Sequence, residues 1–340
     1  MLKRKGLGRM KEAWDYESLS AISRSYQRAS VLAAAVELDV FSALAAGPAT
    51  AVEIAQRVSG DVRGTVILLD AMTAIELLRK EGERYQAAPG AAEVLAHNGP
   101  GGGLAMAQHH ANCMRRWGEL ARVVRTGQRA ERRPSIRDEA GDHESFILAM
   151  DNICGPLAPE VIDALEPLDF THLLDVGGAS GTWTAAFLAR HPQATATLSD
   201  LAKVMPLAQR RIAELGLQDR VTLHAGDSLI DSLPTGADLA WVSAIVHQFS
   251  REENRRLFAN IHRALEPGGT ILVRDVVMEP NRVEPMTGAL FAVNMLVNTP
   301  AGGTFTFEEL RKDLEAGGFG NVYLAHDGAG MNSVVGARKA

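Results

Sequence analysis

The run LLDVGGASG at residues 173–181 constrains this chain more than any other stretch of its sequence. An apolar strand leads directly into a glycine-rich turn, and Thr184 to Arg190 then read as a helix. In α/β proteins such a junction brings backbone N–H groups close to a bound nucleotide. The segment therefore predicts a nucleoside site at the carboxyl end of a strand. Its candidate residues are Asp175, Gly177, Gly178 and Gly181.

The spacing of the glycines indicates which kind of nucleoside could bind. A dinucleotide turn needs G-x-G-x-x-G, but counting from Gly177 places Ala179 and Thr182 at the second and third glycine positions. A pyrophosphate site, and with it a nicotinamide-dependent oxidoreductase, is therefore disfavoured. The alternative is the acid-x-G-x-G-x-G turn of S-adenosylmethionine enzymes, which cradles no phosphate. Asp175, Gly177 and Gly181 fit that pattern, with Ala179 in the place of the middle glycine.

Four motifs follow one another in the second half of the chain: DVGGASG at 175, SD at 199, AGDS at 225, and WVSAIVHQFSREEN through ALEPGGTILVRD. From about Ser145 onward the chain resembles class I S-adenosylmethionine-dependent methyltransferases, and more narrowly the plant-type and bacterial small-molecule O-methyltransferases. The resemblance implies a Rossmann-like, doubly wound domain. It also implies S-adenosylmethionine as methyl donor, S-adenosylhomocysteine as product, and transfer to a hydroxyl of a small, aromatic or polyketide-like metabolite.

The composition limits which binding partners and which cellular compartment are expected for this protein. A net charge of -6 gives no general attraction to nucleic acid or to anionic membranes, and no apolar run is long enough to span a bilayer. The N-terminus is locally basic but no signal-like apolar segment follows, so residues 1–17 are expected to be a flexible tail. Cys113 and Cys154 have no metal-ligand spacing. A reduced, cytoplasmic protein without a metal is expected.

Residues 18–98 predict a small helical domain. Helical segments at 26–44, 50–58 and 62–78 precede a charged hairpin near 80–87, which is the order of a winged helix. Thr50 and Glu53 are spaced as a capping box. Because residues 31–95 hold nine acidic and five basic side chains, the domain is expected to repel DNA. An apolar dimer surface is the preferred interpretation, and the resemblance implies a homodimerisation domain.

Residues 99–165 are expected to link the two domains and to contribute to the substrate pocket. Gly99–Gly103 predicts a break, residues 109–126 a helix, 127–142 an exposed loop, and 143–165 a helix kinked or split by its prolines. From 166 to 340, strands and helices alternate in the doubly wound manner. The predicted strands are 172–176, 194–199, 221–225, 239–243, 270–275, 322–324 and 333–337.

Polar residues at the predicted strand ends are candidates for holding the cofactor. Asp200 follows Gly181 by nineteen residues and can accept hydrogen bonds from both ribose hydroxyls, although capping of the next helix is an alternative. Asp227 can accept from the adenine amine, with Ser228 beside it, or can stabilise a turn. By analogy Leu201 and Trp241 lie near the adenine, or else in the core. Ser243 stands where plant members carry a lysine.

The catalytic candidate is His247, which follows the fourth predicted strand at the position of the family's base. A phenol of pKa near 10 is only about 0.1% ionised at neutral pH, and histidine is suited to deprotonate it. Asp275 matches one of the family's two flanking glutamates and would orient the imidazole. Thr304 stands at the second flanking position, and Gln248 replaces the family's usual aspartate.

Side chains suited to a planar acceptor form the last group of candidates. They are His109, His110, Met150, Phe291 and Met295. For each of them, a place in the core is favoured over a contact with the acceptor. Three alternatives to O-methylation stay open at this stage: methylation of carbon, nitrogen or sulfur, a non-methylating use of the cofactor, and a regulatory protein that binds the cofactor without chemistry.

Overall fold

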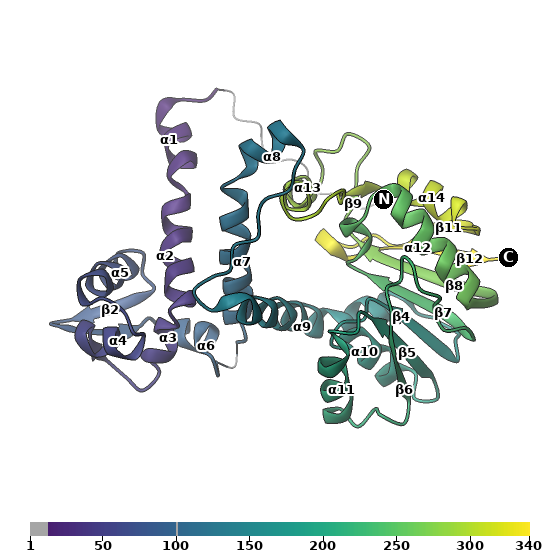
Figure 1. Cartoon of the computed structure of the whole chain (residues 1–340), viewed down its shortest axis with the longest axis horizontal. Helices are drawn as coiled ribbons and strands as arrows, with labels where there is room; N and C mark the ends of the chain where they lie inside the picture. Colours follow the sequence, from purple (N-terminus) through teal and green to yellow (C-terminus); the bar gives the residue numbers. More distant parts are fainter. Residues whose placement is uncertain (1–12, 100) are drawn as a thin grey trace. The chain divides into compact units, whose positions relative to one another are not determined.

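The computed structural model describes residues 13–99 and 101–340, which form two compact units (Figure 1). The smaller unit comprises the residues up to Ala111 together with Ser135–Asp142, and the larger comprises Asn112–Pro134 and His143–Ala340. The basic N-terminal side chains and part of the Gly99–Gly103 break lie outside the described residues. The predicted tail is too long at its C-terminal end, because Tyr16 already begins a helix.

The smaller unit is a helical domain with a three-stranded wing in the order β1-β3-β2. Its buried core includes Phe41, Ile54, Leu69 and Met72. The capping box at Thr50 is confirmed, since both of its hydrogen bonds to Glu53 are present. The elements are α1 (Tyr16–Arg24), α2 (Tyr26–Glu37), α3 (Val40–Ala43), β1 (Ala49–Thr50), α4 (Ala51–Arg57), α5 (Val62–Ala74), β2 (Leu78–Glu81), β3 (Arg84–Ala87), α6 (Ala91–Leu95) and the first part of α7 (Leu104–Trp117).

Three helix predictions need correction. The segment 26–44 forms two helices, because Asp39 adopts a left-handed backbone with φ 55° between α2 and α3. The segment 109–126 also forms two, since α7 ends at Trp117 and α8 (Leu120–Thr126) begins after Gly118. In contrast, α9 (Asp138–Leu165) is one continuous helix that contains Pro156 and Pro159.

The larger unit is built on a seven-stranded sheet in the order β11-β12-β8-β7-β4-β5-β6. Strands β4 to β8 are parallel, and β12 runs antiparallel between β8 and β11. Apolar side chains of α9, α10 and α11 cover one face, and those of α12 and α14 cover the other (Figure 1). The elements are β4 (His172–Val176), α10 (Thr182–Arg190), β5 (Thr195–Asp200), α11 (Met205–Glu214), β6 (Val221–Ala225), β7 (Ala237–Ser243), α12 (Arg251–Ala264), β8 (Leu265–Asp275), α14 (Phe307–Ala316), β11 (Phe319–His326) and β12 (Ser333–Lys339).

The helix α13 (Met286–Asn298) stands between two short strands, β9 (Val277–Met278) and β10 (Phe305–Thr306), which pair in parallel. Residues 112–134 pack along it. The indole N–H of Trp117 donates to Asn294 Oδ1 at 2.9 Å, and the backbone N–H of Ala130 donates to the carbonyl of Val297 at 3.0 Å. These bonds hold α13 in the larger unit.

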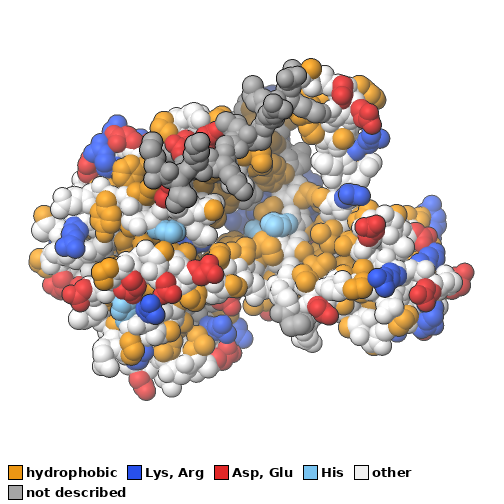
Figure 2. Space-filling view, turned by 180° about the vertical axis from the view of Figure 1, so that it is seen from behind, with side chains coloured by type: hydrophobic (Ala, Val, Ile, Leu, Met, Phe, Trp, Pro, Cys, Tyr) orange, Lys and Arg blue, Asp and Glu red, His pale blue; other side chains and the backbone are white. Residues whose placement is uncertain are grey.

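The surface carries charged side chains of both signs. On the face shown in Figure 2, acidic and basic side chains are mixed, and the blue side chains form no continuous band. Among residues 13–99 and 101–340, none of the helices is both long enough and apolar enough to cross a membrane.

Candidate functional site

The glycine turn connects β4 to α10 and depends on its glycines in two ways. Gly177 and Gly181 have φ values of 73° and 86°, which side chains rarely tolerate. A Cβ on Gly178 would lie 2.7 Å from Leu198 Cγ, so the turn can approach β5 only without a side chain there. Ala179 has φ 48°, and thus an alanine adopts the left-handed backbone at the middle position of the pattern.

Asp175 lies beneath this turn and is fully buried. The Thr184 hydroxyl, in the first turn of α10, donates to its Oδ2 at 2.6 Å. Burial raises the pKa of Asp175 to about 7, and the nearby Asp200 carboxylate acts in the same direction. A cationic group bound above the turn would favour the ionised form of this carboxyl.

Asp200 ends β5 directly beside the turn. Its Oδ2 accepts the Ala179 N–H at 2.9 Å, and its Oδ1 accepts the Leu201 N–H at 2.7 Å. Burial raises the pKa of Asp200, and both backbone bonds oppose the shift. Leu201 follows with 42% of its surface exposed, an apolar side chain open to a ligand.

Asp227 follows the end of β6 and stabilises its own turn. Its Oδ1 accepts the Leu229 N–H at 2.9 Å, and its backbone N–H donates to Asp231 Oδ2 at 2.8 Å. The carbonyl of the adjacent Ser228 accepts from the Asn260 amide at 2.9 Å, which ties this turn to α12. Oδ2, the other carboxylate oxygen of Asp227, takes part in neither of the two Asp227 bonds.

Of two predicted cofactor residues, Trp241 lies in the core, whereas Ser243 ends β7 as predicted and has a partner within the protein. Trp241 is wholly buried against Trp183 and Phe187, with ring centroids 4.9 and 5.1 Å apart, so it belongs to the core and not to an adenine-facing surface. The Ser243 hydroxyl accepts from Arg274 Nη1 at 3.0 Å. Arg274 is buried, and burial lowers its pKa. A charged residue inside the strand ILVRD was the signal that could have drawn attention to it.

The donor set fits a cationic nucleoside better than a phosphate ester. Asp175, Asp200 and Asp227 stand at the ends of three adjacent parallel strands, β4, β5 and β6. Carboxylates at those positions repel a pyrophosphate but accept hydrogen bonds from ribose hydroxyls and an amine. Together with the exposed Leu201 they suit S-adenosylmethionine.

A buried polar contact at the ends of β7 and β8 joins His247 to Asp275. His247 lies in the short 3-10 helix η1 (Val246–Gln248) after β7, and Asp275 ends the neighbouring strand β8. The His247 Nδ1 is 2.8 Å from Asp275 Oδ2 and 3.1 Å from Oδ1, and both side chains are buried. The Val276 N–H donates to Asp275 Oδ1 at 2.7 Å. The shorter aspartate therefore reaches the imidazole directly, without a bridging water.

The remaining candidates lie in different surroundings. The Phe291 ring stands edge-on to the His247 ring with centroids 4.8 Å apart. Met295 is buried one turn further along α13, and Met150 is half-buried on α9. Thr304 is buried, and its carbonyl accepts from Arg282 at 3.2 Å. The rings of His109 and His110 lie 6.1 Å apart on α7, in the smaller unit.

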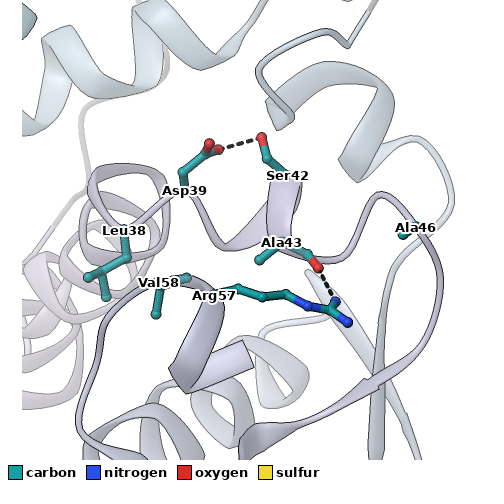
Figure 3. Close-up of a pocket in the computed structure, with 7 residues that line it drawn as sticks. All are labelled: Leu38, Asp39, Ser42, Ala43, Ala46, Arg57 and Val58. Carbon is teal, nitrogen blue, oxygen red and sulfur yellow. Dashed lines mark hydrogen bonds between the residues drawn. The ribbon is translucent and has the colours of Figure 1, made fainter. Parts of the chain in front are cut away.

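The smaller unit also contains a surface pocket of about 490 Å³ (Figure 3). Its polar groups serve local structure: the Ser42 hydroxyl donates to Asp39 at 2.6 Å, and Arg57 donates to the Ala43 carbonyl at 2.6 Å. Among the described residues, no cluster of histidine, cysteine and carboxylate side chains could hold a metal ion. The polar groups of the surface pocket are thus used in local hydrogen bonds.

The fold and site thus define a doubly wound nucleoside-binding domain with a buried histidine–carboxylate pair. Residues 127–320 match the O-methyltransferase domain family, and residues 21–97 match the O-methyltransferase dimerisation domain. The chain belongs to the O-methyltransferase family. It is an S-adenosylmethionine-dependent O-methyltransferase with the helical dimerisation domain and the Rossmann-like domain that its sequence predicts.

Individual relatives align over nearly the whole chain. The tetracenomycin polyketide synthesis 8-O-methyl transferase TcmO of Streptomyces glaucescens is 32% identical over 88% of this chain and 90% of its own length. The 3-hydroxy-5-methyl-1-naphthoate 3-O-methyltransferase of Streptomyces sahachiroi is 31% identical over 95% of both chains. Human N-acetylserotonin methyltransferase, solved in complex with SAM, is 25% identical and superimposes with a TM-score of 0.80, covering 97% of this chain and 99% of that one.

Proposed function

We propose that this protein methylates a phenolic hydroxyl of a small polyketide-like aromatic, with His247 as general base. The buried contact between His247 and Asp275 carries the proposal. It joins the ends of β7 and β8, next to the strand that leads into the glycine turn. The names of the two Streptomyces relatives, a polyketide 8-O-methyl transferase and a naphthoate 3-O-methyltransferase, support the acceptor class.

The arrangement assigns a separate role to each nitrogen of the imidazole. Asp275 is held by the Val276 N–H and accepts from Nδ1, so the proton of the neutral ring resides on Nδ1. Nε2 is then the nitrogen that takes the phenolic proton. The Asp275 carboxylate stabilises the imidazolium that results. The edge of Phe291 against the ring restricts its rotation.

The cofactor residues complete the proposal. Asp200 would bind the ribose, Asp227 with Ser228 the adenine amine, Leu201 the adenine face, and the turn from Gly177 to Gly181 with Asp175 the methionyl end. When bound, S-adenosylmethionine supplies a sulfonium methyl group whose departure leaves a neutral thioether. The acceptor pocket is proposed to be shaped by Phe291, Met295 and Met150 of the larger unit, and Ser243 supports the site through Arg274.

The activity is tested by incubating the purified protein with methyl-labelled S-adenosylmethionine and a panel of acceptors. The panel contains 3-hydroxy-1-naphthoate, 1-naphthol, catechol, an aromatic amine and an aromatic thiol. We expect label on the hydroxyl of a naphthoic or naphtholic acceptor, located by mass spectrometry. Label on nitrogen, sulfur or carbon instead would contradict O-methylation. Binding of S-adenosylhomocysteine without any transfer would favour a regulatory protein.

The helix α1 is proposed to form part of the homodimer interface. Tyr16, Leu19 and Ile22 lie on one side of it and are 87%, 52% and 56% exposed. This apolar stripe adjoins the N-terminal end of the matched dimerisation domain, which begins at residue 21, and a second copy of the chain would cover it. The double change Leu19→Asp with Ile22→Asp is expected to give monomers in light scattering, whereas Ala21→Asp on the opposite side keeps the dimer. Dimers from both variants would remove α1 from the interface.

A further inference from the structure

The loop from Thr299 to Thr304, which connects α13 to β10, lies against the main chain of His247. The backbone N–H of Gly303 donates to the carbonyl oxygen of His247 at 2.9 Å. Thr299 anchors the start of this loop at the end of α13. Its hydroxyl donates to the Met295 carbonyl at 2.8 Å and accepts the Gly302 N–H at 2.8 Å. The loop thus links α13 directly to the backbone of the candidate base.

Gly302 allows this close approach because it has no side chain. A Cβ at this position would collide with the His247 carbonyl oxygen and lie 2.5 Å from Thr299 Oγ1 and 3.0 Å from the carbonyl carbon of Gln248. Two of these three contacts are backbone, which cannot swing aside as a side chain can. Gly303 differs, since a Cβ there would meet nothing within 4 Å. The two glycines therefore offer a matched comparison.

Helix α12 also holds η1 in place. The buried Asn254 donates from its amide to the carbonyl of Val246 at 2.9 Å. Two consecutive carbonyl groups of η1 therefore accept hydrogen bonds from other elements. The Val246 carbonyl accepts from Asn254, and the His247 carbonyl accepts from Gly303. Helix α13, from which the loop starts, also contacts the His247 side chain, because the Phe291 ring packs against the imidazole.

We infer that Gly302 and Gly303 form a brace that positions His247 against Asp275, and that this brace transmits the placement of α13 to the base. The inference rests on the proposed role of His247. The two glycines are positioning residues, because they touch the main chain of His247 and not its ring. Because a misplacement of about 1 Å in a catalytic group can lower the rate about 100-fold, a side chain at Gly302 should be felt in the chemical step.

The test compares Gly302→Ala with Gly303→Ala in the full-length protein. Histidine side-chain NMR with 15N labelling reports the Nδ1–H that bonds Asp275, assigned by its loss in His247→Ala. We expect Gly302→Ala to shift or remove this signal and Gly303→Ala to preserve it, while both bind S-adenosylhomocysteine within about twofold of the parent. An unchanged Nδ1–H signal in Gly302→Ala would overturn the brace. So would a loss of S-adenosylhomocysteine affinity in that variant as large as its loss of activity.

Kinetics separate the brace from a general loss of structure. With 1-naphthol as acceptor, Gly302→Ala is expected to lower kcat about 10- to 100-fold. With 4-nitrophenol, whose hydroxyl is far more acidic, the deficit should shrink because less help from a base is needed. The pair Thr299→Ala with Gly302→Ala should stay impaired, and recovery would assign the damage to Thr299. Full activity of His247→Ala would instead refute the proposed base, whatever the brace does.

Discussion

Replacing His247 by alanine is expected to lower kcat about 100-fold or more with a phenolic acceptor, in line with the loss of a general base. The imidazole is buried and bonded to Asp275 through Nδ1. The cofactor candidates lie on β4, β5 and β6, and η1 follows β7. S-adenosylhomocysteine affinity, measured by calorimetry, should therefore change less than about twofold.

His262→Ala is the matched control for that variant. His262 is another histidine of the larger unit, and its ring packs edge-on against Phe319 with centroids 5.1 Å apart. Its removal should lower the free energy of unfolding, as the loss of an aromatic contact does, without lowering kcat of the folded enzyme. If His247→Ala behaved like His262→Ala, with reduced stability and an unchanged kcat, His247 would be a packing residue.

The doubly wound fold was predictable from the sequence because its signals are local. Most of the parallel strands contain a short apolar run that ends at or beside a glycine or a polar residue. The strand-end rule then predicts Asp200, Asp227 and His247 at one edge. The family resemblance supplies Asp275 as the partner of His247, and the pairing of β7 with β8 places both residues at that edge. The direct bond between the two side chains is a finding of the structure.

Features that depend on contacts between distant parts of the chain were not predictable from the sequence. Both faces of the sheet are covered by helices, so the stretch of β7 from Leu239 to Val242 is apolar, and its pattern cannot show which side Trp241 faces. The hydrogen bonds from Arg274 to Ser243 and to Asn332 join residues that are far apart in the sequence. The contact of Gly302 with His247 also bridges more than fifty residues, and a glycine pair in a loop carries no mark of what packs against it.

Asp275→Asn is expected to impair catalysis through the tautomer of His247 and not through its position. The Oδ1 atom can keep its bond from the Val276 N–H, so the side chain holds its place. The amide nitrogen then replaces Oδ2 and points a donor at Nδ1, where a carboxylate oxygen now accepts at 2.8 Å. To avoid two facing donors, the ring must carry its proton on Nε2, the nitrogen that has to accept from the phenol.

The expected loss in kcat is about 100- to 10,000-fold, the scale seen when the carboxylate that orients a catalytic histidine becomes an amide. Asp275→Glu keeps the charge and restores the residue type of the resembled family, so it should lose less than Asp275→Asn despite its extra methylene in a buried site. The double change with His247→Ala should cost no more than His247→Ala alone, because residues that act as a unit are not additive. Equal losses in the amide and glutamate variants would show that Asp275 serves packing, whereas additive losses in the double variant would show that it acts independently of His247.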